Sequence, residues 1–355
     1  MSPLRLGFVG AGSMGQAAHL RNYAALEDCQ LAALAELRPE LARKVAQRYG
    51  VARAYATHRE MIRQERSDLD AIVCIGPFTH HGSILPDLLA TGLPVLTEKP
   101  MAGSVAIGEQ LLAKCRAAGG QWYVAYHKRS DPAVMWARRQ IETWKASGQM
   151  GAMRYVRITM PPGDWIAGGF TWLIRTDEPY PAGQADPAPA GMSGGQFKLC
   201  TEFVNFYIHQ VNLLRHLLGE PYRVTWVDPS GVLLVGHGSS GVTGAIEMEP
   251  YRTRGAWQEA AVVCFEKGWI RIELPAPLAI NHPGRVIFYT DPGDGAEPQR
   301  MEPQLPWIDA MRQQAIHFLK AVRGENTPLA TAEEALEDLR IAQQWLDLRQ
   351  NDVKK

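Results

Sequence analysis

A glycine-rich turn near the N-terminus has the residue types and the spacing that bind the pyrophosphate of a dinucleotide. An apolar run, residues 4–9, passes directly into Gly10-Ala11-Gly12-Ser13-Met14-Gly15. Gly10 permits the turn, Gly12 lets the backbone approach the phosphates, and Gly15 lets a helix pack close to the strand. The N–H groups at the start of that helix, expected over residues 16–26, attract the anion. We therefore expect residues 10–15, Ser13 and Met14 included, to bind a dinucleotide.

An acidic residue follows the next apolar run at the distance that suits the adenosine ribose. Residues 31–35 end in Glu36, twenty-one residues after Gly15. A carboxylate there accepts hydrogen bonds from the ribose hydroxyls and repels a 2′-phosphate, which favours NAD. Arg38, two residues further on, leaves NADP as an alternative. The competing interpretation is a structural glycine turn followed by an ordinary surface glutamate.

A lysine at the end of an expected strand could polarise a reacting hydroxyl. Lys99 stands in Glu98-Lys99-Pro100, directly after the strand expected over residues 94–97. A strand end is rigid, and Pro100 restricts the local backbone further. We expect Lys99 to reach a hydroxyl that lies over the nicotinamide. The alternative is a surface lysine before a turn.

A helix expected over residues 202–218, capped by Thr201, carries polar residues on one face. At about 100° per residue, five of them fall on one narrow stripe: Glu202, Asn205, His209, Asn212 and His216. Asparagine and histidine suit directional hydrogen bonds to a ligand, although a solvated polar face remains the alternative. Imidazole titrates near neutral pH, so His209 is the candidate general base.

The elements around these residues predict an α/β protein. Strands and helices alternate over residues 1–126, which indicates a doubly wound parallel Rossmann sheet. The expected strands there cover residues 55–56, 70–75, 94–97 and 122–126, and the helices cover 39–49, 58–64, 81–91 and 104–118. Ligands bind beyond the carboxyl ends of such strands. Residues Ile75, Gly76, Pro77 and His80 should therefore face the nicotinamide half of the cofactor.

The second half of the chain changes character. A helix over residues 132–146, capped by Asp131, precedes a strand over 156–160. Six later runs indicate a large, mostly antiparallel open sheet: residues 223–227, 231–235, 244–247, 260–265, 269–274 and 286–289. Two helices, over residues 307–323 and 332–349, follow, and Thr331 with Glu334 forms a capping box at the second.

A long irregular segment, residues 161–196, is rich in proline and glycine. Such segments are often functional. Because Trp165, Trp172 and Arg175 lie in it, we expect an ordered loop that covers a substrate site. A surface insertion is the alternative.

The composition excludes several classes of protein. The 355 residues carry no net charge, so neither a nucleic acid nor a membrane surface is an expected partner. Because no apolar run is long enough to span a bilayer and the N-terminus goes straight into an expected strand, we expect neither a membrane span nor a secretory leader. Five scattered cysteines, none in CxxC spacing, indicate free thiols and no metal site. We expect a soluble, cytoplasmic protein.

The motifs, taken in order, resemble those of the Gfo/Idh/MocA oxidoreductases. They are GAGSMG with Glu36, IGPFTHH, TEKP, VAYHKRSDP, GGQFKLCTEFVNFYIHQVNLLRHLLG and AIHFLKAVRGENTPLATAEEALEDLRIAQ. The resemblance implies a Rossmann domain over residues 1–126 and a C-terminal α+β domain over 127–355, whose last helices could pack back towards the first. It implies a homodimer or homotetramer formed through the open sheet. It also implies a nicotinamide cofactor held by the residues named above together with Glu98, Lys99 and His127.

The resemblance further implies the chemistry. The substrate is a sugar, cyclitol or similar polyol, Lys99 and His209 are the catalytic pair, and Lys128 lies near the substrate. Asn205 and Asn212 stand where the family usually has aspartates, and His127 replaces an asparagine. Asparagine cannot take up a proton. Lys99 and His209 must therefore transfer the proton of the reacting hydroxyl, while Asn205 orients a hydroxyl of the substrate.

These departures suggest an unusual substrate. We expect a glycoside, or a sugar whose anionic group meets Lys128, Arg129 or Arg175. The leading hypothesis is an NAD-dependent dehydrogenase. One alternative is a glycosidase that oxidises its substrate transiently, eliminates the aglycone and reduces the product again. A second is a regulator that senses NAD without turnover.

Overall fold

The computed structural model describes residues 2–181, 183, 185–293 and 295–353. These residues form two compact units, each built from three segments of chain. Unit 1 contains residues 1–126, 168–201 and 311–339, and unit 2 contains residues 127–167, 202–310 and 340–355. The division expected from the sequence, 1–126 and 127–355, assigns the second and third segments of unit 1 to the other domain.

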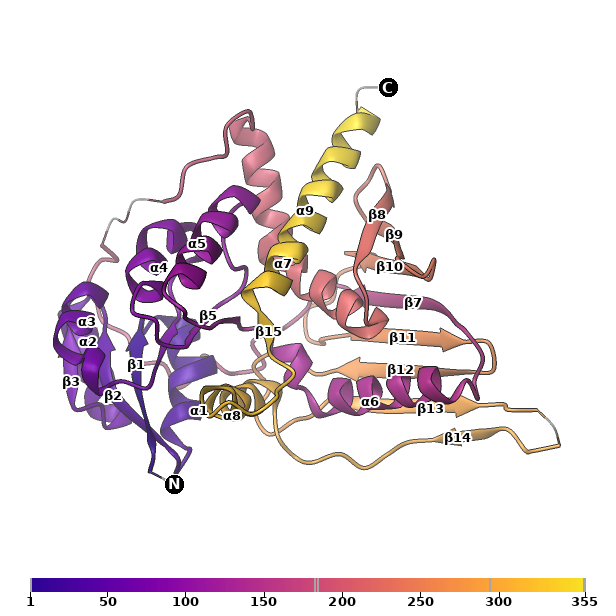
Figure 1. Cartoon of the computed structure of the whole chain (residues 1–355), viewed down its shortest axis with the longest axis horizontal. Coiled ribbons are helices and arrows are strands. Elements are labelled where there is room, and N and C mark those ends of the chain that lie inside the picture. The colour runs from indigo at the N-terminus through magenta and orange to yellow at the C-terminus, as the bar shows by residue number, and fades with distance from the viewer. Residues whose placement is uncertain (1, 182, 184, 294, 354–355) are drawn as a thin grey trace. The chain divides into compact units, whose positions relative to one another are not determined.

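Unit 1 is organised around a sheet that has seven strands among the described residues, in the order β15-β6-β5-β4-β1-β2-β3 (Figure 1). The strands are β1 (Leu4–Val9), β2 (Cys29–Ala35), β3 (Arg53–Tyr55), β4 (Ala71–Cys74), β5 (Val95–Thr97), β6 (Trp122–Val124) and β15 (Ala330–Thr331). Strands β1 to β6 are parallel, and β15 pairs antiparallel with β6 at the edge. The order of the parallel strands is that of the doubly wound dinucleotide-binding fold.

The helices of unit 1 follow the expected alternation. They are α1 (Arg21–Ala24), α2 (Pro39–Tyr49), α3 (His58–Glu65), α4 (His81–Leu89), α5 (Val105–Ala117) and α8 (Ala310–Val322). The helix expected over residues 16–26 is instead a π-helical turn, Gly15–Leu20, followed by the short α1. Such π-helical turns are rare and occur often at functional sites.

Unit 2 contains a mostly antiparallel sheet, eight-stranded within the described residues, with the order β14-β13-β12-β11-β7-β10-β9-β8. Its strands are β7 (Met153–Met160), β8 (Tyr222–Val227), β9 (Leu233–Gly238), β10 (Thr243–Met248), β11 (Glu259–Phe265), β12 (Gly268–Leu274), β13 (Arg285–Thr290) and β14 (Gln299–Met301). Among the described strand pairs of this second sheet, only β7 and β10 are parallel. The expected fold class is therefore confirmed.

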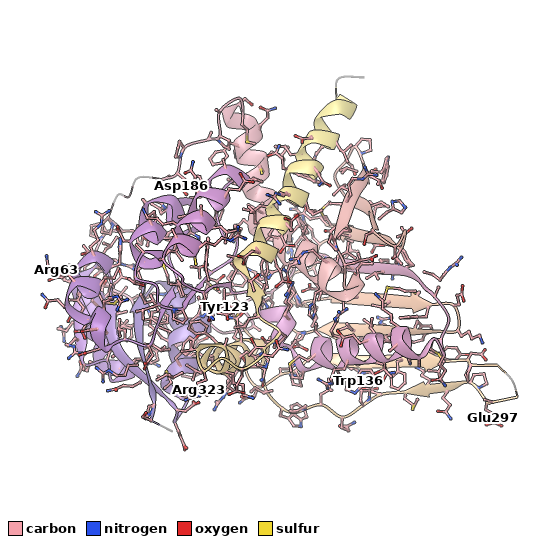
Figure 2. All side chains as sticks on the ribbon, viewed as in Figure 1. Arg63, Tyr123, Trp136, Asp186, Glu297 and Arg323 are labelled. Carbon is pink, nitrogen blue, oxygen red and sulfur yellow. The ribbon has the colours of Figure 1, made fainter. Side chains whose placement is uncertain are left out.

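Helix α6 (Pro132–Ser147) packs along β12 and β13 (Figure 1). The Asp131 carboxylate accepts a hydrogen bond from the Ala133 N–H, which confirms the expected helix cap. The Trp144 ring on α6 lies edge-on to Phe265, with 5.2 Å between ring centroids, and Trp136 packs on Phe288 (Figure 2). One face of the sheet is thereby buried.

Two helices have residues in both units. Helix α7 spans Gly194–Leu218 and α9 spans Ala332–Val353. Helix α7 begins eight residues before the expected start, so the expectation that Thr201 caps it is wrong; the Thr201 hydroxyl donates to the Lys198 carbonyl inside the helix. The capping box of α9 is confirmed, because Thr331 and Glu334 each bind the other's N–H group.

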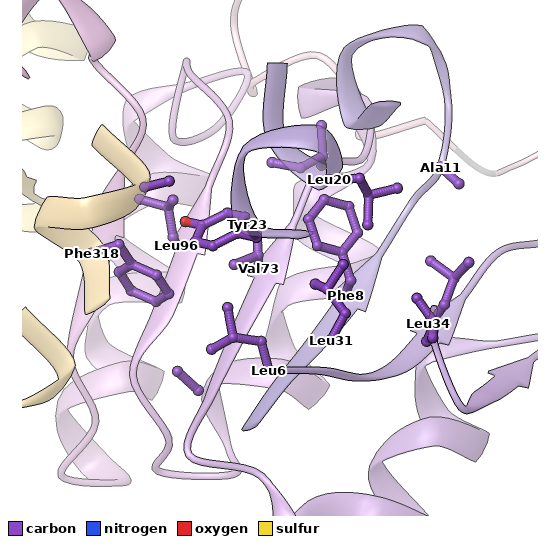
Figure 3. Close-up of a cluster of buried hydrophobic side chains, with 14 of the residues drawn as sticks. Leu6, Phe8, Ala11, Leu20, Tyr23, Leu31, Leu34, Val73, Leu96 and Phe318 are labelled. Atoms are coloured by element: carbon purple, nitrogen blue, oxygen red, sulfur yellow. The ribbon is translucent and has the colours of Figure 1, made fainter. Parts of the chain in front are cut away.

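The core of unit 1 depends on a residue from near the end of the chain. The Phe318 ring of α8 is fully buried and lies edge-on to Tyr23, at a centroid distance of 6.4 Å (Figure 3). It also lies edge-on to Tyr123, at 6.1 Å. Tyr23 in turn packs on Phe8 of β1. Helix α8 therefore completes the hydrophobic core that supports β1 and the glycine turn.

We predict that Phe318→Ala lowers the free energy of unfolding by about 3–5 kcal/mol, because it opens a cavity among aromatic rings. Phe206→Ala is the matched control, since the Phe206 side chain is 60% exposed. Denaturant unfolding of the two variants checks the prediction. Equal midpoints would contradict the role assigned to Phe318.

Candidate active site

The glycine turn lies at the carboxyl edge of the parallel sheet, after β1. Gly10 has φ +91°, and a Cβ on it would lie 2.5 Å from the Ile75 carbonyl oxygen. A Cβ on Gly15 would lie 2.3 Å from the Gly10 carbonyl oxygen. The fold itself therefore requires these two glycines.

Gly12 differs from its neighbours. Apart from Gly12 itself and its two chain neighbours, no atom of the described residues comes within 4 Å of the place where its Cβ would be. The protein has no steric reason of its own for a glycine at this position. The open space suits the close approach of a pyrophosphate, and the residues present fit a bound dinucleotide.

Glu36 joins the glycine turn to the end of β2. Its side chain is 4% exposed, and its carboxylate accepts hydrogen bonds from the Ala11 N–H at 2.8 Å and from Arg38 Nε at 2.8 Å. The hydrogen bond to Glu36 raises the pKa of the Arg38 guanidinium. Glu36 is thus held where the sequence predicts a ligand for the adenosine ribose.

The ends of β4 and β5 place the remaining predicted residues of unit 1 at the same edge. Gly76 and Pro77 follow β4, and the His80 imidazole contacts the Thr79 hydroxyl at 3.1 Å. Lys99 follows β5, and the Lys99–Pro100 peptide bond is cis. Parallel strands end at one edge, so Lys99 shares it with the glycine turn.

Glu98 has a structural partner that the sequence did not suggest. Its carboxylate contacts His19 Nε2 at 2.8 Å and accepts a hydrogen bond from the Lys99 N–H at 3.0 Å. Burial, the largest single effect, raises the pKa of Glu98, but the hydrogen bond to His19 and the nearby His19 and Lys99 charges together lower it below its usual value. Glu98 therefore ties the π-helical turn to the end of β5, beside Lys99.

Part of the long irregular segment packs on unit 1. We call residues 168–181 the strap. The Gln16 side chain accepts from the Ile174 N–H at 2.9 Å and donates to the Ile174 carbonyl at 3.0 Å. The Glu178 carboxylate accepts from the N–H groups of Glu40 and Leu41, both at 2.9 Å. The strap thus binds the helices that follow β1 and β2.

Beyond the strap, Asp186 makes a similar contact with the helix that follows β4. Its carboxylate accepts from the Gly82 N–H at 3.0 Å, and its own N–H donates to the Thr79 carbonyl (Figure 2). Trp172 and Arg175 belong to the strap, and their side chains are exposed. Trp165 lies in unit 2, where its carbonyl accepts from the Leu278 N–H.

In unit 2, the middle of α7 brings two predicted residues together. The His127 and His209 rings lie edge to face, with 4.7 Å between centroids. Asn205, one turn before His209, is exposed. Asn212 and Arg129 are buried, and Arg129 Nε donates to the Asn212 side-chain oxygen at 2.8 Å. The expected polar stripe therefore runs from the surface at Asn205 into the interior at Asn212.

Lys128 belongs to a buried network that the sequence did not reveal. Its ammonium pairs with the Glu259 carboxylate, which also accepts from Gln210 Nε2 at 2.7 Å and from Trp257 Nε1 at 3.2 Å. Both members of the ion pair are at most 5% exposed. Glu259 begins β11, inside an alternating apolar pattern that gave no signal of a buried acid.

A pocket in unit 2 opens beside this network. Its wall includes His127, Lys128, Asp131, His282 and Asp309. Burial raises the pKa of the Asp131 carboxyl to about 6, against the opposing effect of hydrogen bonds from Ala133 and Gly284. Lys128 and His127 both line this pocket, together with apolar residues such as Leu274.

Comparison with known proteins identifies the N-terminal part of the chain. The family described as "Oxidoreductase family, NAD-binding Rossmann fold", GFO_IDH_MocA, matches residues 4–126. Residues 4–126 therefore match the Gfo/Idh/MocA family. The family predicted from the motifs, and NAD as its cofactor, are thereby confirmed.

Three relatives extend the comparison. The rhizopine catabolism protein MocA of Rhizobium meliloti is 24% identical over 100% of this chain and 98% of its own. A myo-inositol 2-dehydrogenase of Thermotoga maritima is 22% identical over 64% of this chain and 58% of its own, so little more than half of that enzyme is covered. The solved structure of a levoglucosan dehydrogenase with NADH and levoglucosan superposes with a TM-score of 0.72 at 17% identity, over 99% of this chain and 98% of that one.

The Gfo/Idh/MocA comparison supports an NAD-binding oxidoreductase with dehydrogenases of sugars and cyclitols among its relatives. Within the described residues, no helix combines the length and the apolar character needed to cross a membrane. Lys99 belongs to unit 1 and His209 to unit 2. Their joint action is therefore part of the proposal below.

We predict that Glu259→Ala lowers the free energy of unfolding by about 3–5 kcal/mol, because it leaves the buried Lys128 ammonium without its carboxylate. Glu247→Ala is the control on the same sheet. Its ion pair with Arg157 is partly exposed, so it should cost about 1 kcal/mol or less. Urea unfolding of both variants measures the two free energies of unfolding. A Glu259 variant as stable as the Glu247 variant would contradict the prediction.

Proposed function

We propose that the protein is an NAD-dependent dehydrogenase that oxidises a hydroxyl of a sugar, sugar derivative, glycoside or cyclitol, or reduces the corresponding ketone. The observation that carries this proposal is the arrangement at one sheet edge. The open position at Gly12, the Glu36 carboxylate on the Ala11 N–H, and Lys99 after β5 share that edge. A glycine turn alone would support only nucleotide binding.

The residues of unit 1 take the cofactor role in this proposal. Residues 10–15 would hold the pyrophosphate and Glu36 the adenosine ribose, while Gly76, Pro77 and His80 lie at the end of β4 that adjoins β1. When bound, NAD accepts or returns the hydride. Glu98 and His19 fix the backbone that presents Lys99.

The proton transfer is assigned to Lys99 and His209. Lys99 polarises the reacting oxygen, and His209 accepts its proton because a neutral imidazole is a base near neutral pH. The edge-to-face contact with His127 limits the rotation of the His209 ring. Asn205, one turn away, is assigned to orient a substrate hydroxyl.

The substrate class rests on the relatives and on the charges of the chain. The relatives include a myo-inositol and a levoglucosan dehydrogenase. Lys128 and Arg129 are buried and held by Glu259 and Asn212, whereas Arg175 is exposed on the strap. Arg175 is therefore the stronger candidate for meeting an anionic group on the substrate.

A glycosidase with transient oxidation is the second candidate. The contacts of Ile174 and Glu178 with the helices after β1 and β2 favour it, because a strap at the cofactor edge would slow the release of a bound dinucleotide. A cofactor that stays bound suits a cycle in which the hydride returns to the product.

We predict that Lys99→Ala lowers kcat by about 10²–10⁴-fold, the usual contribution of a group that assists proton transfer. Its affinity for NAD should stay close to that of the unaltered protein. Lys114→Ala, on α5, is the control and should keep full activity. The assay incubates protein and NAD with free sugars, inositols and glycosides, and follows NADH by absorbance and products by mass.

The outcomes separate the candidates. NADH with a product two mass units lighter than its substrate supports the dehydrogenase. Released aglycone without net NADH supports the glycosidase instead. Unchanged turnover in Lys99→Ala would contradict both, and NAD binding without any turnover would favour an NAD-sensing regulator.

We also propose that the chain forms a homo-oligomer through the face of the large sheet that α6 leaves uncovered. Along β11, buried and partly exposed residues alternate strictly. The partly exposed ones are Ala260, Val262 and Cys264. Trp269 and Tyr289 stack on neighbouring strands at a centroid distance of 6.1 Å. Apolar side chains on an open sheet face suit a partner of the same kind.

We predict that Val262→Asp converts the oligomer into monomers, because a charge would be buried at the interface. Within one chain, the new carboxylate could pair with Arg157 and Arg271, which lie opposite it on the adjacent strands. Val242→Asp, in the turn before β10, is the control and should stay oligomeric. Light scattering after size exclusion measures the mass; an unaltered protein that is already monomeric would refute the proposed interface.

A further inference from the structure

The strap places a carboxylate on the first turn of α2. Glu178 accepts hydrogen bonds from the Glu40 and Leu41 N–H groups, both at 2.9 Å, and from the Thr176 hydroxyl at 3.0 Å. These N–H groups lack partners within a helix and form an anion-binding position there. In this structure the anion is supplied by the chain itself.

This turn of α2 is the part of the fold that distinguishes NAD from NADP. Helix α2 starts three residues after Glu36, with Arg38 as its N-cap residue and Pro39 in its first turn. In dinucleotide-binding folds, the acid after the second strand binds the ribose 2′-hydroxyl, and a nearby arginine accepts a 2′-phosphate. Arg38 is therefore the residue expected to bind the 2′-phosphate of NADP.

Arg38 is already engaged on several sides. Its Nε donates to Glu36 at 2.8 Å, and its guanidinium lies over the Tyr180 ring of the strap, 5.2 Å from the centroid. The Glu178 carboxylate is close enough to interact with the same guanidinium electrostatically. Two carboxylates and an aromatic ring thus surround the Arg38 guanidinium.

We propose that Glu178 is a cofactor-specificity residue, which excludes the 2′-phosphate of NADP by occupying the α2 N-terminus with its own carboxylate. A phosphate carries about −1.5 to −2 charges. It would compete for the N–H groups of Glu40 and Leu41 and would face both Glu36 and Glu178. A neutral ribose hydroxyl meets neither obstacle. The inference rests on the proposed NAD-dependent function.

The test measures binding of NAD⁺ and NADP⁺ to the full chain without substrate, by calorimetric titration. The unaltered protein should prefer NAD⁺ by at least about thirtyfold. Glu178→Ala frees both N–H groups and removes one charge, so its affinity for NADP⁺ should rise about tenfold. Its affinity for NAD⁺ should change by less than about threefold.

Two further variants sharpen the test. Glu40→Ala removes the same charge from the same helical turn, but the Glu40 side chain pairs with Lys44 and is half exposed. It should leave the preference for NAD⁺ nearly unchanged. Glu178→Gln keeps one acceptor oxygen without the charge, so it should give a smaller gain in NADP⁺ affinity and serves if Glu178→Ala does not fold.

The inference is overturned if Glu178→Ala and Glu178→Gln bind NADP⁺ no better than the unaltered protein while still binding NAD⁺. It is also overturned if Glu40→Ala gives an equal gain, since general electrostatics would then explain the preference. A protein that binds neither dinucleotide contradicts both this inference and the proposed function. Normal NAD⁺ binding without turnover contradicts the proposed dehydrogenase alone.

Discussion

The Glu36 carboxylate is the interaction on which the cofactor edge depends. It binds the Ala11 N–H of the glycine turn and the Arg38 side chain at the start of α2, and it does so almost entirely out of water. A buried carboxylate is tolerated only when its hydrogen bonds are made. The turn after β1 and the start of α2 are therefore fixed relative to each other before any ligand arrives, and preorganisation of this kind lowers the cost of binding.

Much of unit 1 could be predicted from the sequence, because local rules determined it. The glycine spacing and the buried parallel strands each depend on residues near one another in the chain. The same holds for the cap at Asp131, which lies in unit 2. The position of the helix after the turn was predicted correctly, but its first part is a π-helical turn and not an α-helix. Gln16 and His19 of this π-helical turn contact Ile174 and Glu98, which lie far along the chain and are outside the reach of local rules.

The parts that the sequence did not predict are long-range pairings. Glu259 lies 131 residues from its partner Lys128, and its strand carries only an apolar alternation. The strap contacts unit 1 through hydrogen bonds from the first N–H groups of α2 to Glu178. The periodicity of the sequence gives no sign of such bonds. The start of α7 was misplaced because Thr201 is a residue type that commonly caps helices, and the glycines at 194 and 195 suggest a loop before it. Tertiary packing can override such weak local preferences.

The interleaving of the two units affects how the protein could be divided. A fragment that ends at Tyr126 would contain the glycine turn and six parallel strands, but neither Phe318 nor β15. Tyr23 and Tyr123 would lose their aromatic partner, and β6 would become an open sheet edge. Exposed strand edges next to apolar surface pair readily with other chains. The nucleotide-binding unit is thus not a module that can be excised at its last parallel strand, because residues 311–339 complete both its core and its sheet.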